Sequence, residues 1–181
     1  RKVIGFIGDS TFFHAGLPAL ASAVHNNHDL TLVILDNGTT AMTGHQPHPG
    51  AEMAAKGLPL TYIPIEGAVK GLGVKHVSIV NPMKLKQMQQ AIKEAADFKG
   101  VSVVISRALC PMLALPKEKK KKKRSFYVNE NKCKNHRDCL NLLGCPAFFV
   151  EDGKVKIDET ICTGCALCTQ ICSENAILPK K

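Results

Sequence analysis

The stretch that decides the fold of the first part of the chain is residues 3–37, VIGFIGDSTFFHAGLPALASAVHNNHDLTLVILDN. Val3–Ile7 and Leu30–Leu35 are short apolar runs, which are typical of parallel strands buried on both faces. Between them, Pro18 can occupy the first turn of a helix that we expect to extend to about Val24. A strand, a helix and a second strand in this order predict a βαβ unit with a right-handed crossover.

The alternation of strands and helices continues along the chain. We expect two further strands at His76–Val80 and Val101–Ser106, and a short strand over 61–65. We also expect a short helix over 67–72 and a longer helix over 83–98. The longer helix follows Asn81-Pro82, which suits an N-cap and a first turn, and its apolar residues recur at helical spacing. Residues 36–60 show no periodicity, and loops of this length inside a compact domain are usually functional. The fold predicted for residues 1–116 is therefore an α/β domain on a parallel sheet.

Seven of the eight cysteines fall within the last 49 residues, at the spacing of iron–sulfur ligands. The intact run reads C-x2-C-x2-C-x3-C over residues 162–172. In two-cluster ferredoxins the fourth thiolate of such a run ligates the neighbouring cluster. We therefore expect one [4Fe–4S] cluster on four thiolates, those of Cys145, Cys162, Cys165 and Cys168.

The other run carries a histidine where its second cysteine should be, and reads Cys133-x2-His136-x2-Cys139-x5-Cys145. A second cluster would use Cys133, Cys139 and Cys172, with its fourth iron facing His136. Three alternatives follow from this departure. His136 ligates iron, as imidazole does in some clusters, or the site holds a [3Fe–4S] cluster, or the second cluster is absent.

Strand signals surround the cysteine runs. Phe126–Asn129, Phe148–Val150 and Val155–Ile157 are predicted strands, and the last two flank Asp152-Gly153, a strong signal for a tight hairpin. Together with short helices after the cysteine runs, they predict a small α+β domain of the two-cluster ferredoxin type over residues 126–181.

The net charge of +9 is concentrated in one short segment. Residues 117–124, KEKKKKKR, contribute +6, whereas residues 1–116 contribute +3 and residues 125–181 contribute zero. We predict a solvated basic linker over 117–125, with steering of an acidic ferredoxin as the sharper alternative. Nucleic-acid binding is disfavoured because no aromatic residues interleave with the charges.

Three features indicate the cellular setting. No apolar run approaches the ~18 residues that a membrane span needs. The chain opens on an apolar strand rather than a secretory signal. Cysteines at metal-ligand spacing disfavour a disulfide framework. We therefore expect a soluble, cytoplasmic protein that uses neither a membrane nor nucleic acid.

Polar residues follow the first two predicted strands. Gly8–Ser10 comes directly after the first strand and Asp36-Asn37 after the second, with 25 residues between them. Ligands of doubly wound sheets bind outside the carboxyl ends of the strands, so both turns should face one crevice. Carboxylate and amide oxygens suit Mg²⁺, and backbone N–H groups at the start of the following helix can hold a diphosphate.

This arrangement resembles the thiamine diphosphate motif, a GDG and an NN separated by a similar interval. It departs from the motif in having Ser10 for Gly and Asp36 for Asn. The longer run GDSTFFHAGLPALASAVHN…LVILDNGTTAMTGHQPHPG resembles the thiamine domain of indolepyruvate:ferredoxin oxidoreductase alpha subunits, whose chain also ends in a two-cluster ferredoxin module. The resemblance covers nearly all of the 181 residues.

The resemblance implies roles for individual residues. Mg²⁺ would be ligated by Asp9, Asn37 and the backbone carbonyl of Thr39. The cofactor and its diphosphate would be lined by Gly8, Asp9, Ser10, Thr11, Asn37, Gly38, Thr39 and Thr40. The loop 40–46 would lie beside the thiazolium, where His14 and His45 are candidate catalytic groups. For each histidine the alternative is a structural hydrogen bond or a solvated loop.

The resemblance also implies an activity. It is the oxidative decarboxylation of an arylpyruvate to acyl-CoA and CO2, with electrons passing through iron–sulfur clusters to ferredoxin. The cofactors would be thiamine diphosphate, Mg²⁺ and the clusters, and coenzyme A would accept the acyl group. The expected partners are a beta subunit and a pyrimidine-binding portion in a hetero-oligomer. We expect the 181 residues alone to lack activity, as a C-terminal fragment or one product of a split gene.

Two alternatives stay open. The chain is an electron-transfer protein whose front domain is only a scaffold, or it is part of a related 2-oxoacid:ferredoxin oxidoreductase with another substrate. Asp9 and Asn37 are both present, which favours a working thiamine site over a scaffold.

Overall fold

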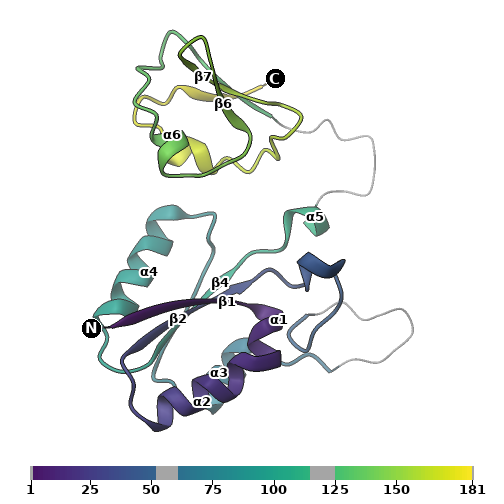
Figure 1. Cartoon of the computed structure of the whole chain (residues 1–181), viewed down its shortest axis with the longest axis vertical. Coiled ribbons are helices and arrows are strands. Elements are labelled where there is room, and N and C mark those ends of the chain that lie inside the picture. The colour runs from purple at the N-terminus through teal and green to yellow at the C-terminus, as the bar shows by residue number, and fades with distance from the viewer. Residues whose placement is uncertain (1, 52–60, 115–124, 181) are drawn as a thin grey trace. The chain divides into compact units, whose positions relative to one another are not determined.

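The computed structural model describes residues 2–51, 61–114 and 125–180. The chain forms two compact units, Arg1–Ala114 and Leu115–Lys181 (Figure 1). The predicted basic linker, 117–125, lies outside the described residues except for Ser125. The domain limits drawn from the sequence therefore stay predictions.

The first unit is built on four parallel strands in the order β1-β2-β4-β3. The strands are β1 (Val3–Gly8), β2 (Leu30–Asp36), β3 (His76–Val80) and β4 (Ser102–Arg107). Each coincides with a predicted strand to within one residue at either end, so the expected α/β fold with a parallel sheet is confirmed. β4 lies inside the sheet, between β2 and β3, and its residues 102–106 are all buried.

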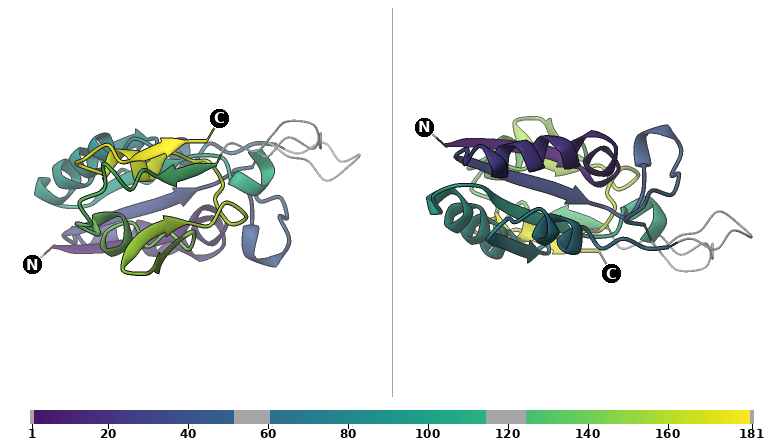
Figure 2. Two further views of the ribbon diagram at one scale, coloured as in Figure 1. Left: turned by 90° about the horizontal axis from the view of Figure 1, so that it is seen from above. Right: turned by 90° about the horizontal axis from the view of Figure 1, so that it is seen from below.

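Helices cover both faces of this sheet. The helices and helical turns described in this unit are α1 (Asp9–Thr11), the π-helical turn η1 (Phe12–Gly16), α2 (Leu17–His25), the 3-10 turn η2 (Ala41–Thr43), α3 (Ile65–Gly71), α4 (Leu85–Asp97) and α5 (Pro111–Ala114). In Figure 1, α4 lies on one side of the sheet and α2 and α3 on the other, and Figure 2 shows this second side from below.

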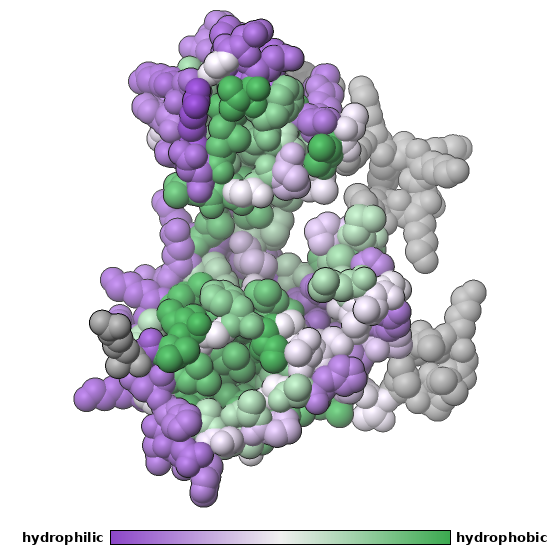
Figure 3. All heavy atoms as spheres, viewed as in Figure 1, coloured by the Kyte–Doolittle hydropathy of each residue, from purple (hydrophilic) through white to green (hydrophobic). Residues whose placement is uncertain are grey.

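Two apolar clusters hold these layers together. The larger cluster joins the sheet to η1, α2 and α3, and contains Phe12, Leu20, Ile34, Ile65, Val69, Val103 and Ile105. The smaller one joins Val33 and Val104 of the sheet to Ala91 and Ala95 of α4. β1 is an edge strand, and its Val3, Ile4 and Phe6 are exposed. Figure 3 shows hydrophobic surface on the side of the unit that carries this strand.

Two predictions for the first unit differ from the structure. A strand over 61–65 is wrong, because residues 61–64 are not in a strand and Ile65 begins α3. Pro64 precedes this helix in an extended conformation and has no N–H for a strand ladder, while Ile65 is fully buried. The helix predicted over 83–98 begins only at Leu85, after a turn in which Asn81 Oδ1 accepts the Met83 N–H at 2.8 Å.

The second unit contains two antiparallel pairs of strands, β5–β8 and β6–β7. Its elements are β5 (Phe126–Val128), α6 (Asp138–Asn141), β6 (Phe148–Glu151), β7 (Lys154–Ile157), the 3-10 turn η3 (Leu167–Gln170) and β8 (Ile177–Pro179). The predicted hairpin is confirmed, since Asp152 and Gly153 both have positive φ, 49° and 72°. Strand β8 was not predicted.

The two halves of the second unit repeat each other at a spacing of 29 residues. The Cys133 N–H donates to the carbonyl of Asn129, and the Cys162 N–H donates to the carbonyl of Asp158, 29 positions further on. Asn129 and Asp158 themselves donate to the carbonyls of Ala176 and Ala147, again 29 positions apart. The two cysteine runs therefore leave equivalent strands in equivalent ways.

In the part of the chain that the structure describes, no helix is long and apolar enough to cross a membrane.

Candidate functional site

Asp9 connects the turns that follow β1 and β2. Its side chain is almost fully buried. Its Oδ1 accepts the Ser10 N–H at 2.8 Å, and its Oδ2 accepts the N–H groups of Asn37 and Gly38 at 3.0 and 2.8 Å. The parallel register pairs Gly8 with Leu35, so both turns leave the same edge of the sheet. The two turns therefore meet at this edge, joined by the Asp9 carboxylate.

The loop after β2 is ordered around the same carboxylate. Asn37 Oδ1 accepts the Thr39 N–H at 3.0 Å, and the Thr40 hydroxyl donates to Ser10 Oγ at 2.9 Å. Gly38 has φ +76°, and a Cβ there would meet Leu109 at 3.4 Å. A side chain at position 38 would thus be strained as well as crowded. The structure brings together Asp9, Ser10 and residues 37–40 from two separate turns.

A cavity of about 290 Å³ opens beside these residues. Its lining is Ser10, His14, Thr40, Thr43, Gln46, Pro47, His48 and Pro49. His14, one of the two predicted catalytic candidates, lines this cavity. His45 does not line this cavity; it has φ +62°, and its Nδ1 is buried without a hydrogen-bond partner in the described residues. Thr11 is exposed on α1.

His48 is a site residue that the sequence reasoning missed. Its Nε2 lies 3.1 Å from Asp9 Oδ2, and both side chains are only 3% exposed. The sequence offers one weak signal for His48, which is that it lies in TGHQPHPG, the same segment that carries His45. Nothing in that local pattern indicates that the chain folds back to bring residue 48 onto residue 9.

The departure from the thiamine motif at Asp36 has a structural counterpart. Arg107 Nε donates to Asp36 Oδ2 at 2.6 Å, and its Nη2 donates to Glu66 Oε2 at 2.6 Å. Glu66 and then Asp36 hold the pKa of Arg107 above its ordinary value, and the hydrogen bond from Arg107 lowers the pKa of Glu66. The buried carboxylate that replaces a neutral amide is therefore neutralised by an arginine on the neighbouring strand.

The residues present fit a magnesium site of the kind that takes few protein ligands. Asp9 offers a carboxylate, Asn37 an amide oxygen and Thr39 a backbone carbonyl, all from the two turns that hydrogen bonds to Asp9 join, and these are hard oxygen ligands. Among the described residues, no three His, Cys, Asp or Glu side chains group closely enough to hold one metal ion. The predicted magnesium site contains only one side chain of those types, Asp9.

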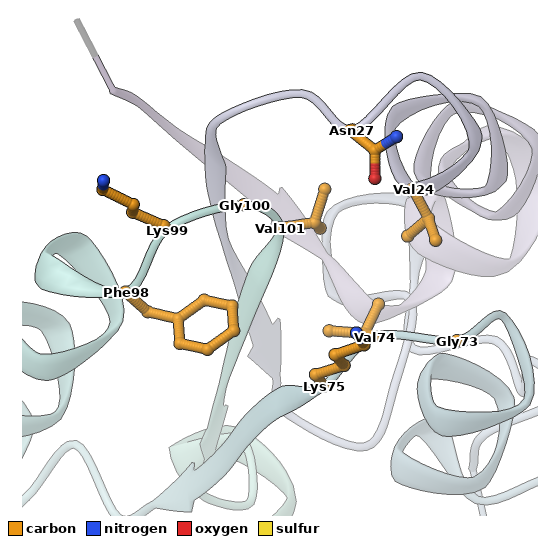
Figure 4. Close-up of a pocket in the computed structure, with 9 residues that line it drawn as sticks. All are labelled: Val24, Asn27, Gly73, Val74, Lys75, Phe98, Lys99, Gly100 and Val101. Carbon is orange, nitrogen blue, oxygen red and sulfur yellow. The ribbon is translucent and has the colours of Figure 1, made fainter.

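Another cavity of the first unit, about 140 Å³, lies at the opposite end of the strands (Figure 4). It is lined by residues from the end of α2 and from the segments before β3 and β4, among them Val24, Lys75 and Phe98. None of the predicted site residues lines it, so it does not belong to the candidate site.

The thiols assigned to the first cluster lie close together in the second unit. Burial first, and then the nearby thiols of Cys165, Cys162 and Cys145, raise the pKa of Cys168 to about 11. These three neighbours are the other members of the predicted ligand set. Because the thiolate is the form that binds metal, ligation of iron by Cys168 requires the loss of this proton.

The thiols assigned to the second cluster form another group. Burial first, and then Cys172 and Cys133, raise the pKa of Cys139. Cys133, Cys139, Cys172 and His136 also line one cavity. All eight cysteines are free, so no disulfide competes with metal binding. The described residues contain no group of three side chains that could hold one metal ion. This result does not exclude a [4Fe–4S] cluster, because each thiolate of such a cluster binds a different iron atom.

His136 occupies the place in the first run that Cys165 occupies in the second. Both residues lie between two residues of positive φ, 58° and 65° in the first run and 76° and 61° in the second, which are Asn135, Arg137, Gly164 and Ala166. His136 Nε2 lies 3.2 Å from Glu174 Oε1, and Lys134 Nζ lies 3.1 Å from the other oxygen of Glu174. Lys134 first, and then His136, lowers the pKa of Glu174.

Comparison with known proteins agrees with the geometry of the first unit. Residues 1–106 match the family model of the thiamine pyrophosphate enzyme, C-terminal TPP binding domain. A 2-oxoglutarate:ferredoxin oxidoreductase from Magnetococcus marinus has a similar structure, with a TM-score of 0.53 and 26% identity over 57% of this chain and 38% of that chain.

Curated relatives match nearly the whole chain. Indolepyruvate oxidoreductase subunit IorA of Methanothermobacter marburgensis is 47% identical over 99% of this chain, and that of Archaeoglobus fulgidus is 43% identical over 100%. The match spans 28% and 29% of the length of these two relatives.

Proposed function

Because the chain belongs to the thiamine pyrophosphate enzymes, through their C-terminal TPP-binding domain, we propose that it is the cofactor-binding and electron-relaying part of a 2-oxoacid:ferredoxin oxidoreductase that acts on an arylpyruvate. The observation that carries this proposal is the presence, in one chain, of the Asp9 site and two groups of neighbouring thiols. The names of the relatives support indolepyruvate as the substrate.

In this proposal the carboxyl edge of the sheet binds thiamine diphosphate and Mg²⁺. Asp9, Asn37 and the Thr39 carbonyl ligate the metal, and the diphosphate lies against Gly8, Ser10, Thr11, Gly38 and Thr40. The bound cofactor supplies an electron sink for the loss of CO2. His14 and His45 are the candidate proton-transfer groups, of which His14 lines the cavity beside Ser10.

The second unit is the electron path. We assign residues 126–181 to a ferredoxin-like domain, residues 117–125 to a linker and residues 1–116 to the thiamine domain. Cys145, Cys162, Cys165 and Cys168 hold one [4Fe–4S] cluster. Cys133, Cys139 and Cys172 hold the second, as a cubane completed by His136 or as a [3Fe–4S] cluster.

The reaction balances with two one-electron carriers. A 2-oxo acid and coenzyme A yield an acyl-CoA, CO2, one proton and two electrons, and the electrons reduce two ferredoxins. Coenzyme A as acyl acceptor is supported by the Magnetococcus enzyme, whose structure contains coenzyme A and succinyl-CoA. A beta subunit and the remaining length of the full protein complete the enzyme.

The second candidate function is electron transfer alone, with the first unit as a scaffold. Melting of the full-length enzyme with thiamine diphosphate and Mg²⁺ distinguishes the two. A ligand at 100 times its Kd stabilises the folded state by about 2.7 kcal/mol. We expect a rise in Tm for the wild type and none for Asp9→Ala. A wild type whose Tm does not respond supports the scaffold and contradicts our proposal.

A further inference from the structure

We propose that His48 is a positioning residue that orients the carboxylate of Asp9 for Mg²⁺. The proposal rests on the proposed function, because it concerns the metal site of the thiamine cofactor. It is carried by three features of the structure, which are the hydrogen bonding of the His48 ring, the number of donors around Asp9 and the packing that holds the ring in place.

The hydrogen bond at Nδ1 determines which ring nitrogen carries the proton. The Gly50 N–H donates to His48 Nδ1 at 3.2 Å. In a neutral imidazole one nitrogen accepts and the other donates, so the proton lies on Nε2. That nitrogen is 3.1 Å from Asp9 Oδ2, and it makes no hydrogen bond of regular geometry within the described residues. Among the described residues, the negative charge beside the buried Nε2–H is therefore that of Asp9.

The donors around Asp9 are unevenly distributed between its two oxygens. Oδ2 accepts the N–H groups of Asn37 and Gly38 and also faces His48 Nε2, whereas Oδ1 accepts only the Ser10 N–H within residues 2–51, 61–114 and 125–180. Each carboxylate oxygen has two lone-pair positions. Oδ2 is saturated, so Oδ1 is the oxygen with a lone pair left for a cation. Three N–H groups lie around Oδ2 and oppose rotation of the carboxylate. Two belong to the backbone, and the third, that of His48, belongs to a side chain.

The chain is built to hold this ring in place. The ring of Phe13 lies 6.0 Å from that of His48, with 33° between their planes. A Cβ on Gly50 would come within 2.5 Å of the Phe13 ring and would touch the His48 ring at 3.4 Å, so a side chain at position 50 would displace Phe13. The Ala51 N–H donates to the His48 carbonyl at 2.9 Å, which closes the turn. A ring fixed on one side by packing can serve as a fixed donor on the other.

The test compares variants that separate the shape of the ring from its N–H donor, in the full-length enzyme. His48→Phe keeps an aromatic ring against Phe13 but removes the donor, whereas His48→Gln replaces the ring but keeps an N–H. The matched control is His76→Phe, which changes another imidazole with a buried, unpartnered Nε2 that stacks on Phe98, away from Asp9. Where His48→Phe lowers the Tm of the cofactor-free enzyme, His48→Leu takes its place.

The measurement is the calorimetric titration of Mg²⁺ into enzyme with saturating thiamine diphosphate. Loss of a group that orients a metal ligand costs about 10–100-fold in affinity, and we expect a loss of this size for His48→Phe. We expect His48→Gln and His76→Phe to bind Mg²⁺ like the wild type. Wild-type affinity in His48→Phe overturns the proposal, and so does an equal loss in His48→Phe and His48→Gln. A wild type that binds no Mg²⁺ with thiamine diphosphate overturns the proposed function as well, so the two failures are distinguishable.

Discussion

Arg107→Met should destabilise the first unit strongly, because it leaves a buried carboxylate without its partner. The Asp36 side chain is only 8% exposed, whereas that of Glu66 is 28% exposed. Removing one partner of a buried ion pair costs about 3–5 kcal/mol. Because the Arg107 side chain is itself 35% exposed, we expect the lower end of this range, to which the partly exposed contact with Glu66 adds at most about 1 kcal/mol. Since 1 kcal/mol lowers the Tm of a domain of this size by roughly 4–8 °C, we expect a fall of more than about 10 °C.

The assay is thermal unfolding followed by circular dichroism, with a double-mutant cycle. The variant Asp36→Asn places the amide of the thiamine motif at that position, and Arg107→Met combined with it removes the buried charge as well. We expect the double variant to recover most of the stability lost in Arg107→Met. A loss below about 1 kcal/mol in Arg107→Met, as measured for exposed ion pairs, would refute the reasoning, as would a double variant no more stable than Arg107→Met.

Acid unfolding gives an independent check on the same network. Arg107 lowers the pKa of Glu66 below its ordinary value of 4.5. A carboxyl whose folded-state pKa is lowered contributes stability that is complete above its unfolded pKa and is lost as the pH falls through the folded pKa. The wild type should therefore lose stability below pH 4.5 more steeply than Arg107→Met, and parallel curves would contradict the assignment.

The remaining predictions concern the second unit. Cys168→Ser should lower the iron content of the reconstituted enzyme by about four iron atoms, one cubane. The control Cys110→Ser, which changes a buried thiol outside the predicted ligand sets, should leave the iron content unchanged. Equal iron contents in the two variants would contradict the ligand set. His136→Cys should remove any three-iron signal from the electron paramagnetic resonance spectrum and yield two cubanes, because position 136 has the backbone setting of Cys165. A persistent three-iron signal in that variant would show that a missing ligand is not the cause.

Much of the site follows from patterns that are local in the sequence. Apolar runs predicted the four parallel strands, and parallel strands place the turns that follow them at one edge of the sheet. Asp9 and Asn37 could therefore be paired from the order of the residues alone. Cysteine spacing likewise predicted which thiols lie together around Cys168 and around Cys139, because the closely spaced residues of a run reach one cluster and its fourth thiolate reaches the neighbouring one.

Strand order and the missed strand required the tertiary structure. β4 lies between β2 and β3 although it follows both in the chain, because strand order depends on which faces the helices cover and not on periodicity. β8 is three residues long, and its strand character comes from pairing with β5, about 50 residues earlier. The predicted strand over 61–65 is wrong for the same reason, since no neighbouring strand in the described residues pairs with it.

The sequence by itself therefore determined the kind of protein this is: a parallel α/β domain with a thiamine-type motif, joined to cysteine runs with the spacing of cluster ligands. Only the tertiary structure decided how the motif is held: His48 beside Asp9, and Arg107 between Asp36 and Glu66. The physical reason is distance along the chain. Strand periodicity and ligand spacing depend on neighbours within a few residues, whereas these side chains meet across 39, 71 and 41 residues and are paired only once the sheet has assembled.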